Sequence, residues 1–138
     1  MPGTFRLQII TQQGVRYDGQ VESMRGCSVD GYFGVRPRHA PMVAELVPGV
    51  LDYREPGPTT RFLACSGGIL EVSGQGVVVL ADAIEAAGEI DVERAHQAAA
   101  RAQDRLQRRT DPNVDLRRAE VALQKALNRL RAAHKGEP

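Results

Sequence analysis

Four arginines with helical spacing offer the clearest chemistry in this sequence. Arg94, Arg101 and Arg108 follow one another at intervals of seven residues, and Arg105 lies four residues after Arg101. Such spacing places guanidinium groups along one side of a helix, where they can bind phosphate oxygens or an acidic protein surface. The alternative is a solvated charged face, softened by the acidic residues between the arginines. Further cations follow at Arg118, Lys125 and Arg129.

Motifs for catalysis are absent from the sequence. It holds no phosphate-binding loop of the GxxxxGK[ST] type, no GxSxG elbow and no HExxH pair. We interpret Cys65-Ser66-Gly67-Gly68 as a hairpin turn between two strands. We therefore expect no catalytic residue, no metal site and no required cofactor. The isolated histidines and cysteines, which lack metal-ligand spacing, are His39, His96, His134, Cys27 and Cys65.

The overall composition is that of a folded globular protein. The chain has 138 residues, of which 42% are hydrophobic and 25% charged, and its formal net charge is +1. This balance excludes wholesale disorder and gives no global field that would attract nucleic acid. Its apolar runs, such as 77–81, are far shorter than the roughly 20 residues that span a bilayer. The N-terminus lacks the pattern of a signal peptide, and two distant cysteines fit a reducing cytosol.

The first 87 residues have the pattern of short strands. Gly-rich turns recur every 8–12 residues without intervening helical periodicity, which is typical of an all-β sandwich. Three prolines within 35–48 lack the donor that a sheet needs, so we expect this segment to be loop and edge. The predicted strands cover 5–10, 15–25, 46–54, 61–65, 69–73 and 77–81.

Residues 88–138 have the pattern of an antiparallel two-helix hairpin. Asp91 is a suitable N-cap for a first helix, and Asp111-Pro112-Asn113 ends it. A second helix is expected over about 114–134. The chain also changes charge here, from seven basic and nine acidic residues before Gly88 to eleven and eight from it onward. The fold class is therefore α+β, with a sandwich domain at 1–87 and a helical domain at 88–138.

Half of the expected helix–helix layers are alanine. The first helix offers Val92, Ala95, Ala99, Ala102 and Leu106, at intervals of three and four. Alanine buries about one methyl group where leucine buries four carbons, so this hairpin should open at low cost. The simpler alternative is that small residues let the helices pack closely and stay in place. The second helix repeats Leu116, Leu123 and Leu130 at intervals of seven, with Ala119, Ala126 and Ala133 between them.

Five segments in order give the chain a family resemblance. They are GYFGVRPRHAPM (31–42), LVPGVL (46–51), SGGILEV (66–72), VVVLADA (77–83) and EIDVERA (89–95), and RAEVALQKALNRL (118–130) closes the second helix. With this order and spacing, the whole chain resembles the epsilon subunit of bacterial and plastid F-type ATP synthases.

The resemblance implies a non-catalytic subunit of the rotor stalk. In that family the sandwich binds the gamma subunit and the membrane c-ring, and so helps couple catalysis to proton translocation. The hairpin lies folded on the sandwich or extends toward the catalytic alpha/beta head, where it blocks ATP hydrolysis. The implied location is the cytoplasmic face of the bacterial inner membrane, or the stromal side of the thylakoid, with membrane association only through the complex.

Some family members bind ATP in the folded hairpin, and the resemblance carries their residues onto this chain. A lysine stands at position 125 where those members have arginine, which keeps the charge and loses the planar fork. ATP is thus a candidate regulatory ligand, and a purely mechanical inhibitor is the alternative. The matching positions are Glu85, Ile90, Asp91, Arg94, Ala95, Arg101, Lys125 and Arg129.

The resemblance also marks the loop at 31–42 as a contact with gamma or the c-ring. Some relatives carry an acidic residue after the glycine where this chain has Tyr32, so different polar pairs are expected. From another class, a free-standing ATP-binding module would bind ATP without a gamma subunit. The candidate interface residues are Tyr32, Arg36, Arg38 and His39.

Overall fold

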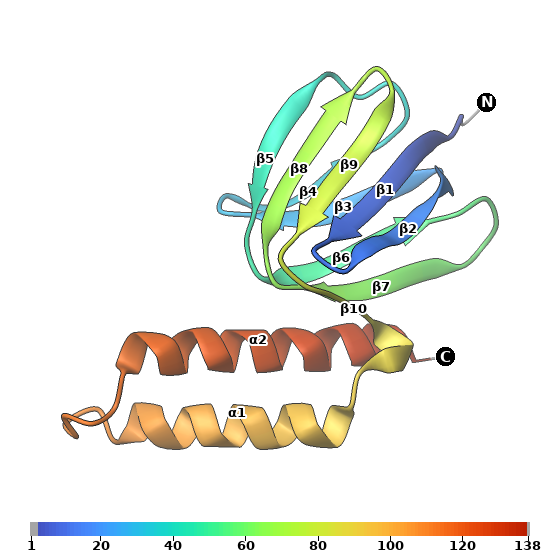
Figure 1. Cartoon of the computed structure of the whole chain (residues 1–138). Coiled ribbons are helices and arrows are strands. Elements are labelled where there is room, and N and C mark those ends of the chain that lie inside the picture. The colour runs from blue at the N-terminus through green and yellow to red at the C-terminus, as the bar shows by residue number, and fades with distance from the viewer. Residues whose placement is uncertain (1–2, 138) are drawn as a thin grey trace.

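The computed structural model of the chain describes residues 3–137, which form a β-sandwich followed by two antiparallel helices (Figure 1). The expected fold class is confirmed. The ten strands are β1 (Phe5–Thr11), β2 (Gly14–Val21), β3 (Ser23–Ser28), β4 (Gly31–Val35), β5 (Met42–Leu46), β6 (Gly49–Arg54), β7 (Thr60–Cys65), β8 (Gly68–Ser73), β9 (Gly76–Ala81) and β10 (Ile84–Ala86). A 3-10 turn (Ala87–Glu89) leads into α1 (Val92–Gln107) and α2 (Leu116–Lys135).

The strands make two layers that share one continuous hydrogen-bonded path. One layer has the order β5-β8-β9-β1-β2, and the other has β10-β7-β6-β3, with β4 added beside β3. β1 and β9 pair in parallel, and the other pairs are antiparallel. A single pairing, Ser28 with Leu46, joins the two layers at one corner.

Alternating apolar residues fill the space between the layers. The nine largest side chains that are less than 2% exposed are Leu7, Ile9, Val21, Met24, Val35, Leu51, Leu70, Val77 and Val79. All residues of this core cluster lie between Leu7 and Ile84. The sandwich therefore has a core to which the helices contribute nothing.

Two details of the strand prediction are wrong. Residues 15–25 form two strands, β2 and β3, rather than one, and Gly31–Val35 is a strand that was not predicted. The segment expected as loop and edge contains β5 (Met42–Leu46), an edge strand of its layer that pairs with β8 along its whole length. The prolines do not prevent this pairing, because Pro41 and Pro48 lie outside the strand.

The predicted hairpin turn at Ser66-Gly67-Gly68 is also wrong. β7 pairs with β6 and β10, whereas β8 pairs with β5 and β9, so this turn carries the chain from one layer to the other. Gly67 and Gly68 have φ of +119° and +144°, which only glycine adopts readily. A Cβ at Gly68 would also overlap the backbone of β9.

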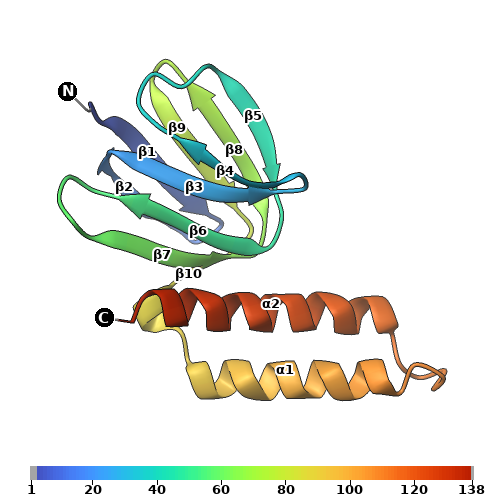
Figure 2. The same ribbon diagram turned by 180° about the vertical axis from the view of Figure 1, so that it is seen from behind.

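α2 lies between the sandwich and α1, a layering that both views show (Figures 1 and 2). The Asp91 and Asp115 side chains accept hydrogen bonds from the Arg94 and Arg118 amides, so both helices have carboxylate N-caps. The alanines of the predicted seam are buried, although Ala133 packs in a cluster with Val50 and Ala64 of the sandwich; of the larger seam residues, Val92 is 43% exposed and Leu116 36%. The helices thus meet through small residues.

Candidate functional site

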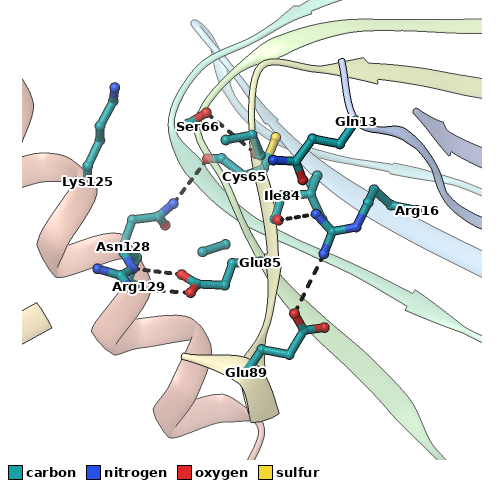
Figure 3. Close-up of a pocket in the computed structure, with 12 residues that line it drawn as sticks. Gln13, Arg16, Cys65, Ser66, Ile84, Glu85, Glu89, Lys125, Asn128 and Arg129 are labelled. Carbon is teal, nitrogen blue, oxygen red and sulfur yellow. Dashed lines mark hydrogen bonds and ion pairs between the residues drawn. The ribbon is translucent and has the colours of Figure 1, made fainter. Parts of the chain in front are cut away.

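A pocket of about 540 Å³ lies where the sandwich meets α2 (Figure 3). Its lining comes from the β1–β2 turn region, from β7 and the turn after it, from β10 and from α2. Three candidates of the nucleotide site, Glu85, Lys125 and Arg129, lie in this lining. The structure therefore brings together residues that are 40 or more positions apart in the chain.

Arg129 and Glu85 form a two-point ion pair across the pocket. The Nε–Oε1 distance is 2.7 Å and the Nη2–Oε2 distance is 3.2 Å. Both side chains are roughly a third exposed, so the pair contributes at most about 1 kcal/mol to docking of α2. Arg129 is thus already occupied, and a phosphate ligand would have to share it.

Lys125 makes no ion pair among residues 3–137, and its ammonium points away from Glu85 and Arg129 (Figure 3). On the sandwich side, Arg16 donates to the Ile84 carbonyl at 3.1 Å and lies 3.6 Å from the Glu89 carboxylate. Two of the three cations in the lining are therefore neutralised within the protein. Lys125 is the one available for an incoming anion.

The other nucleotide candidates lie outside this pocket. Asp91 is engaged as the N-cap of α1, and Ile90 is buried against the sandwich. Ala95 is buried between the helices. Arg94 and Arg101 are exposed on α1 and make no ion pair within the described part of the chain. The structure thus places three of the eight candidates in the pocket and the other five in α1 or directly before it.

Asn128 was missed by the sequence reasoning. It is 3% exposed, and its Nδ2 donates to the carbonyls of Gly49 at 2.8 Å and Cys65 at 3.1 Å. The available signal was weak, because it consists of one amide within an amphipathic helix. Gln13, Arg16 and Glu89 were missed as well, since they come together only through the fold.

The Cys65 thiol in the pocket lining is not suited to nucleophilic chemistry. The thiol of Cys65 donates to the Gly67 carbonyl at 3.6 Å. Burial raises the pKa of the Cys65 thiol, which keeps it protonated and unreactive at neutral pH. The polar groups fit reversible binding of an anion.

The candidate interface residues also fall into two places. Arg36, Arg38 and His39 lie in the loop before β5, at the end of the sandwich away from the helices (Figure 1). They line a hollow together with residues of β1 and of the β8–β9 turn. His39 Nδ1 lies 2.7 Å from the Ala40 carbonyl. Tyr32 lies elsewhere. Its hydroxyl accepts a hydrogen bond from the Val50 amide at 3.3 Å, close to where α2 packs on the sandwich.

An uncovered apolar face lies on the β5-β8-β9-β1 layer, on the side toward the viewer in Figure 1. Val43 is 70% exposed, Ile69 50% and Leu80 52%. Ile69 lies opposite both Glu45 and Leu80 in the strand register, and Val43 lies opposite Glu71. Neighbouring apolar and acidic side chains therefore make a continuous surface, the outer face, that the described residues leave open to solvent.

Two family models match the chain in sequence order. The β-sandwich domain of the ATP synthase delta/epsilon chain matches residues 4–87, and the long α-helix domain of the same chain matches residues 89–134.

Curated relatives match nearly end to end. The ATP synthase epsilon chain of Halalkalibacterium halodurans is 41% identical over 94% of this chain and 97% of its own length. The epsilon chain of Symbiobacterium thermophilum is 47% identical over 92% of this chain and 91% of its own. That of Bacillus velezensis is 44% identical over 94% and 97%.

Solved structures agree with these matches. A chain in the mitochondrial ATP synthase of Euglena gracilis, solved with its F1 part and c-ring, superposes with a TM-score of 0.84 and 26% identity, covering 97% of this chain and 83% of that one. A chain in the central stalk and c-ring of the Tetrahymena thermophila enzyme gives a TM-score of 0.61 at 10% identity, over 95% and 94%. The second likeness concerns the fold alone.

Proposed function

Because the chain belongs to the delta/epsilon-chain family of ATP synthase subunits, we propose that it is a central-stalk subunit whose sandwich binds the rotor and whose helices regulate ATP hydrolysis. It is a non-catalytic subunit of the enzyme. The observation that carries the proposal is the architecture itself: a self-contained sandwich with an uncovered apolar face, joined to a helical pair that touches it along one side.

The outer face supports docking of the sandwich on a gamma subunit. Exposed apolar side chains side by side on neighbouring strands are unusual on a monomer and mark an interaction surface. An Ile69→Asp substitution should weaken co-purification with gamma at least about tenfold, because it places a charge in the buried centre of the contact. Val29→Asp is the matched control, since Val29 is 74% exposed in the β3–β4 turn, away from this face. Equal binding by both variants would remove the outer face from the interface.

The loop before β5 supports a contact with the c-ring. Arg36 and Arg38 are exposed and make no ion pair within residues 3–137, so they can pair with polar or acidic groups of a partner. The loop also lies at the end of the sandwich opposite the helices, which leaves both ends of the molecule accessible at once (Figure 1). Tyr32 belongs to a different contact, nearer the helices.

The thin contact between α2 and the sandwich supports a switch between folded and extended helices. To the apolar part of this contact α2 contributes only Ala132 and Ala133, which pack with Val50, Ala64, Ile90 and the partly buried Phe62. Such small groups bury little area, so the two arrangements need differ by only a few kcal/mol. Extension would bring the exposed arginines of α1 against an acidic surface of the catalytic alpha/beta head.

ATP is the candidate regulatory ligand of the folded state. The pocket supports ATP binding because it places Lys125 and Arg129 near Glu85, where α2 packs on the sandwich. A phosphate bound there would hold the helix on the sandwich. The competing pair Glu85–Arg129 and the missing planar fork at Lys125 both weaken phosphate binding. A purely mechanical inhibitor, without nucleotide sensing, is the second candidate.

Isothermal titration of the isolated chain with ATP, with and without magnesium, separates these two candidates. Binding at micromolar to millimolar concentration supports a sensor, and a Lys125→Arg variant should bind more tightly. Absence of heat with both proteins would reject ATP sensing. Binding of ATP without any association with gamma would favour a free-standing ATP-binding module.

The proposed location is at the membrane surface, through the rest of the enzyme. None of the described helices has the length and apolar content needed to cross a bilayer. The matching relatives named above are bacterial, and we place the chain on the cytoplasmic face of the inner membrane.

A further inference from the structure

α2 packs on two sides, against α1 and against the sandwich. The side toward the sandwich carries a single buried polar side chain. Ala119 and Ala126 follow the seam toward α1, whereas Asn128 and Ala132, four residues apart, face the sandwich together with Ala133. Within residues 3–137, Asn128 is the one buried polar residue that lies in either helix. This second face therefore combines alanine packing with one amide.

The amide binds the ends of two paired strands at once. Gly49 begins β6 and Cys65 ends β7, and the two residues lie opposite one another in the register. Nδ2 of Asn128 donates to both of their carbonyls, at 2.8 and 3.1 Å (the Cys65 bond is visible in Figure 3). Both protons of the amide nitrogen are thereby used.

The surrounding contacts are less directional. Ala132 and Ala133 pack with Val50, Ala64, Ile90 and the partly buried Phe62 in an apolar cluster. The ion pair of Arg129 with Glu85 is partly exposed and is screened by salt. Hydrogen bonds to two fixed carbonyls are directional, and a buried asparagine is a well-attested means of fixing helix register.

We propose that Asn128 is the positioning residue that sets the docked state of the helical pair. It selects one register of α2 on the sandwich and controls the ratio of docked to undocked molecules. This deepens the regulation proposed above and rests on it for its biological meaning, but the isolated chain is enough to test it.

The effect should be confined to docking. When α2 leaves the sandwich, water satisfies the amide and both carbonyls, so a substitution at Asn128 costs nothing in the undocked state. In the docked state, a side chain without donors removes one hydrogen bond from each of the buried Gly49 and Cys65 carbonyls. A carboxylate adds repulsion against these two oxygens. The sandwich core, which ends at Ile84, is untouched.

Hydrogen–deuterium exchange on the full-length chain provides the test. The variants are Asn128→Asp, which is nearly isosteric and removes both donors, and Asn128→Leu, which removes them without adding charge. Gln124→Glu is the matched control, because it makes the same amide-to-acid change at an exposed position of α2. Amides of β1 and β9 report on global stability within the same data.

We expect protection of α2 to fall about tenfold or more in both Asn128 variants, with the larger loss in Asn128→Asp. Protection of β1 and β9 should stay unchanged, and Gln124→Glu should behave like the wild type. Molar salt should leave wild-type α2 protected, since the two amide hydrogen bonds are neutral.

Two results would overturn the proposal. Wild-type protection of α2 in both Asn128 variants would show that the ion pair and the alanines suffice. An equal loss in α2, β1 and β9 would make Asn128 a residue of general stability instead. Because no ATPase is present, neither result bears on whether the chain inhibits hydrolysis.

Discussion

Arg129 and Asn128, which are adjacent in α2, contact the sandwich through different kinds of interaction. Arg129 forms an ion pair with Glu85 that solvent partly screens, while Asn128 forms neutral hydrogen bonds where water is excluded. The charged pair can exchange its partner for a ligand, whereas the amide cannot without undocking the helix. This division would place the proposed ligand sensing and the proposed helix positioning at adjacent residues.

Tyr17 is the residue through which alkaline pH should act on the sandwich. Its ring lies 4.3 Å from that of Tyr53, and its hydroxyl donates to Glu55 at 3.1 Å. Burial raises the pKa of Tyr17, and the hydrogen bond and charge of Glu55 raise it further. Burial also raises the pKa of Tyr53 and of the Cys65 thiol.

Stability should therefore fall above pH 10. The unfolded tyrosine ionises near pH 10, so the favourable contribution of Tyr17 is complete below that pH and is lost as pH rises toward the folded pKa. Between pH 8 and 11 the wild type should lose about 0.5–1 kcal/mol more than Tyr17→Phe, a figure reduced for the partly solvated ring. Urea midpoints at the two pH values measure this difference. Equal losses in both proteins would contradict it.

At the scale of elements, the packing of α1 on α2 depends on the small side chains between the two helices. Ala102 is 1% exposed between the helices, so Ala102→Leu overfills the contact and should destabilise closure of α1 on α2 by about 1–3 kcal/mol. Ala100→Leu, at an exposed position of the same helix, is the control. Thermal melts followed by circular dichroism should show earlier loss of helix only in Ala102→Leu. A wild-type melt would mean that the seam tolerates larger residues.

The elements differ in how well sequence predicts them, for physical reasons. Periodicity and capping chemistry predicted α1 and α2 closely, because helices depend on contacts three and four residues apart. The crossing at Gly67-Gly68 was misjudged, since a turn sequence does not say which strands pair on either side of it. The prolines near β5 predicted loop and edge, and β5 is an edge strand of its layer; its extent was not predicted, because proline beside a strand gives the same signal as proline within it.

The candidate site was harder to predict than the fold. The pairing of Glu85 with Arg129 spans 44 positions, and the bonds of Asn128 span 79 and 63. Nothing local in the sequence encodes such contacts. The family resemblance supplied Glu85, Lys125 and Arg129, and the structure added Asn128 and Arg16.

At the scale of the whole molecule, the sandwich should fold without the helices. Its core cluster includes no residue after Ile84, so a chain ending at residue 87 keeps all of it. Loss of the cover over Val50, Ala64 and Phe62 should lower the free energy of unfolding by about 1–2 kcal/mol. Urea unfolding followed by fluorescence and circular dichroism should give coincident, cooperative transitions. A broad transition with separate midpoints would show that the helices complete the fold.

The same shortened chain gives the most direct test of the proposed function. ATP hydrolysis is measured with the enzyme's own F1 assembly, prepared without this subunit and then supplied with the full chain or with residues 1–87. We expect both to bind the assembly and only the full chain to lower hydrolysis, because only the full chain carries the helices. Equal hydrolysis with the two chains, or failure of the full chain to bind, would contradict a stalk subunit that regulates through its helical pair.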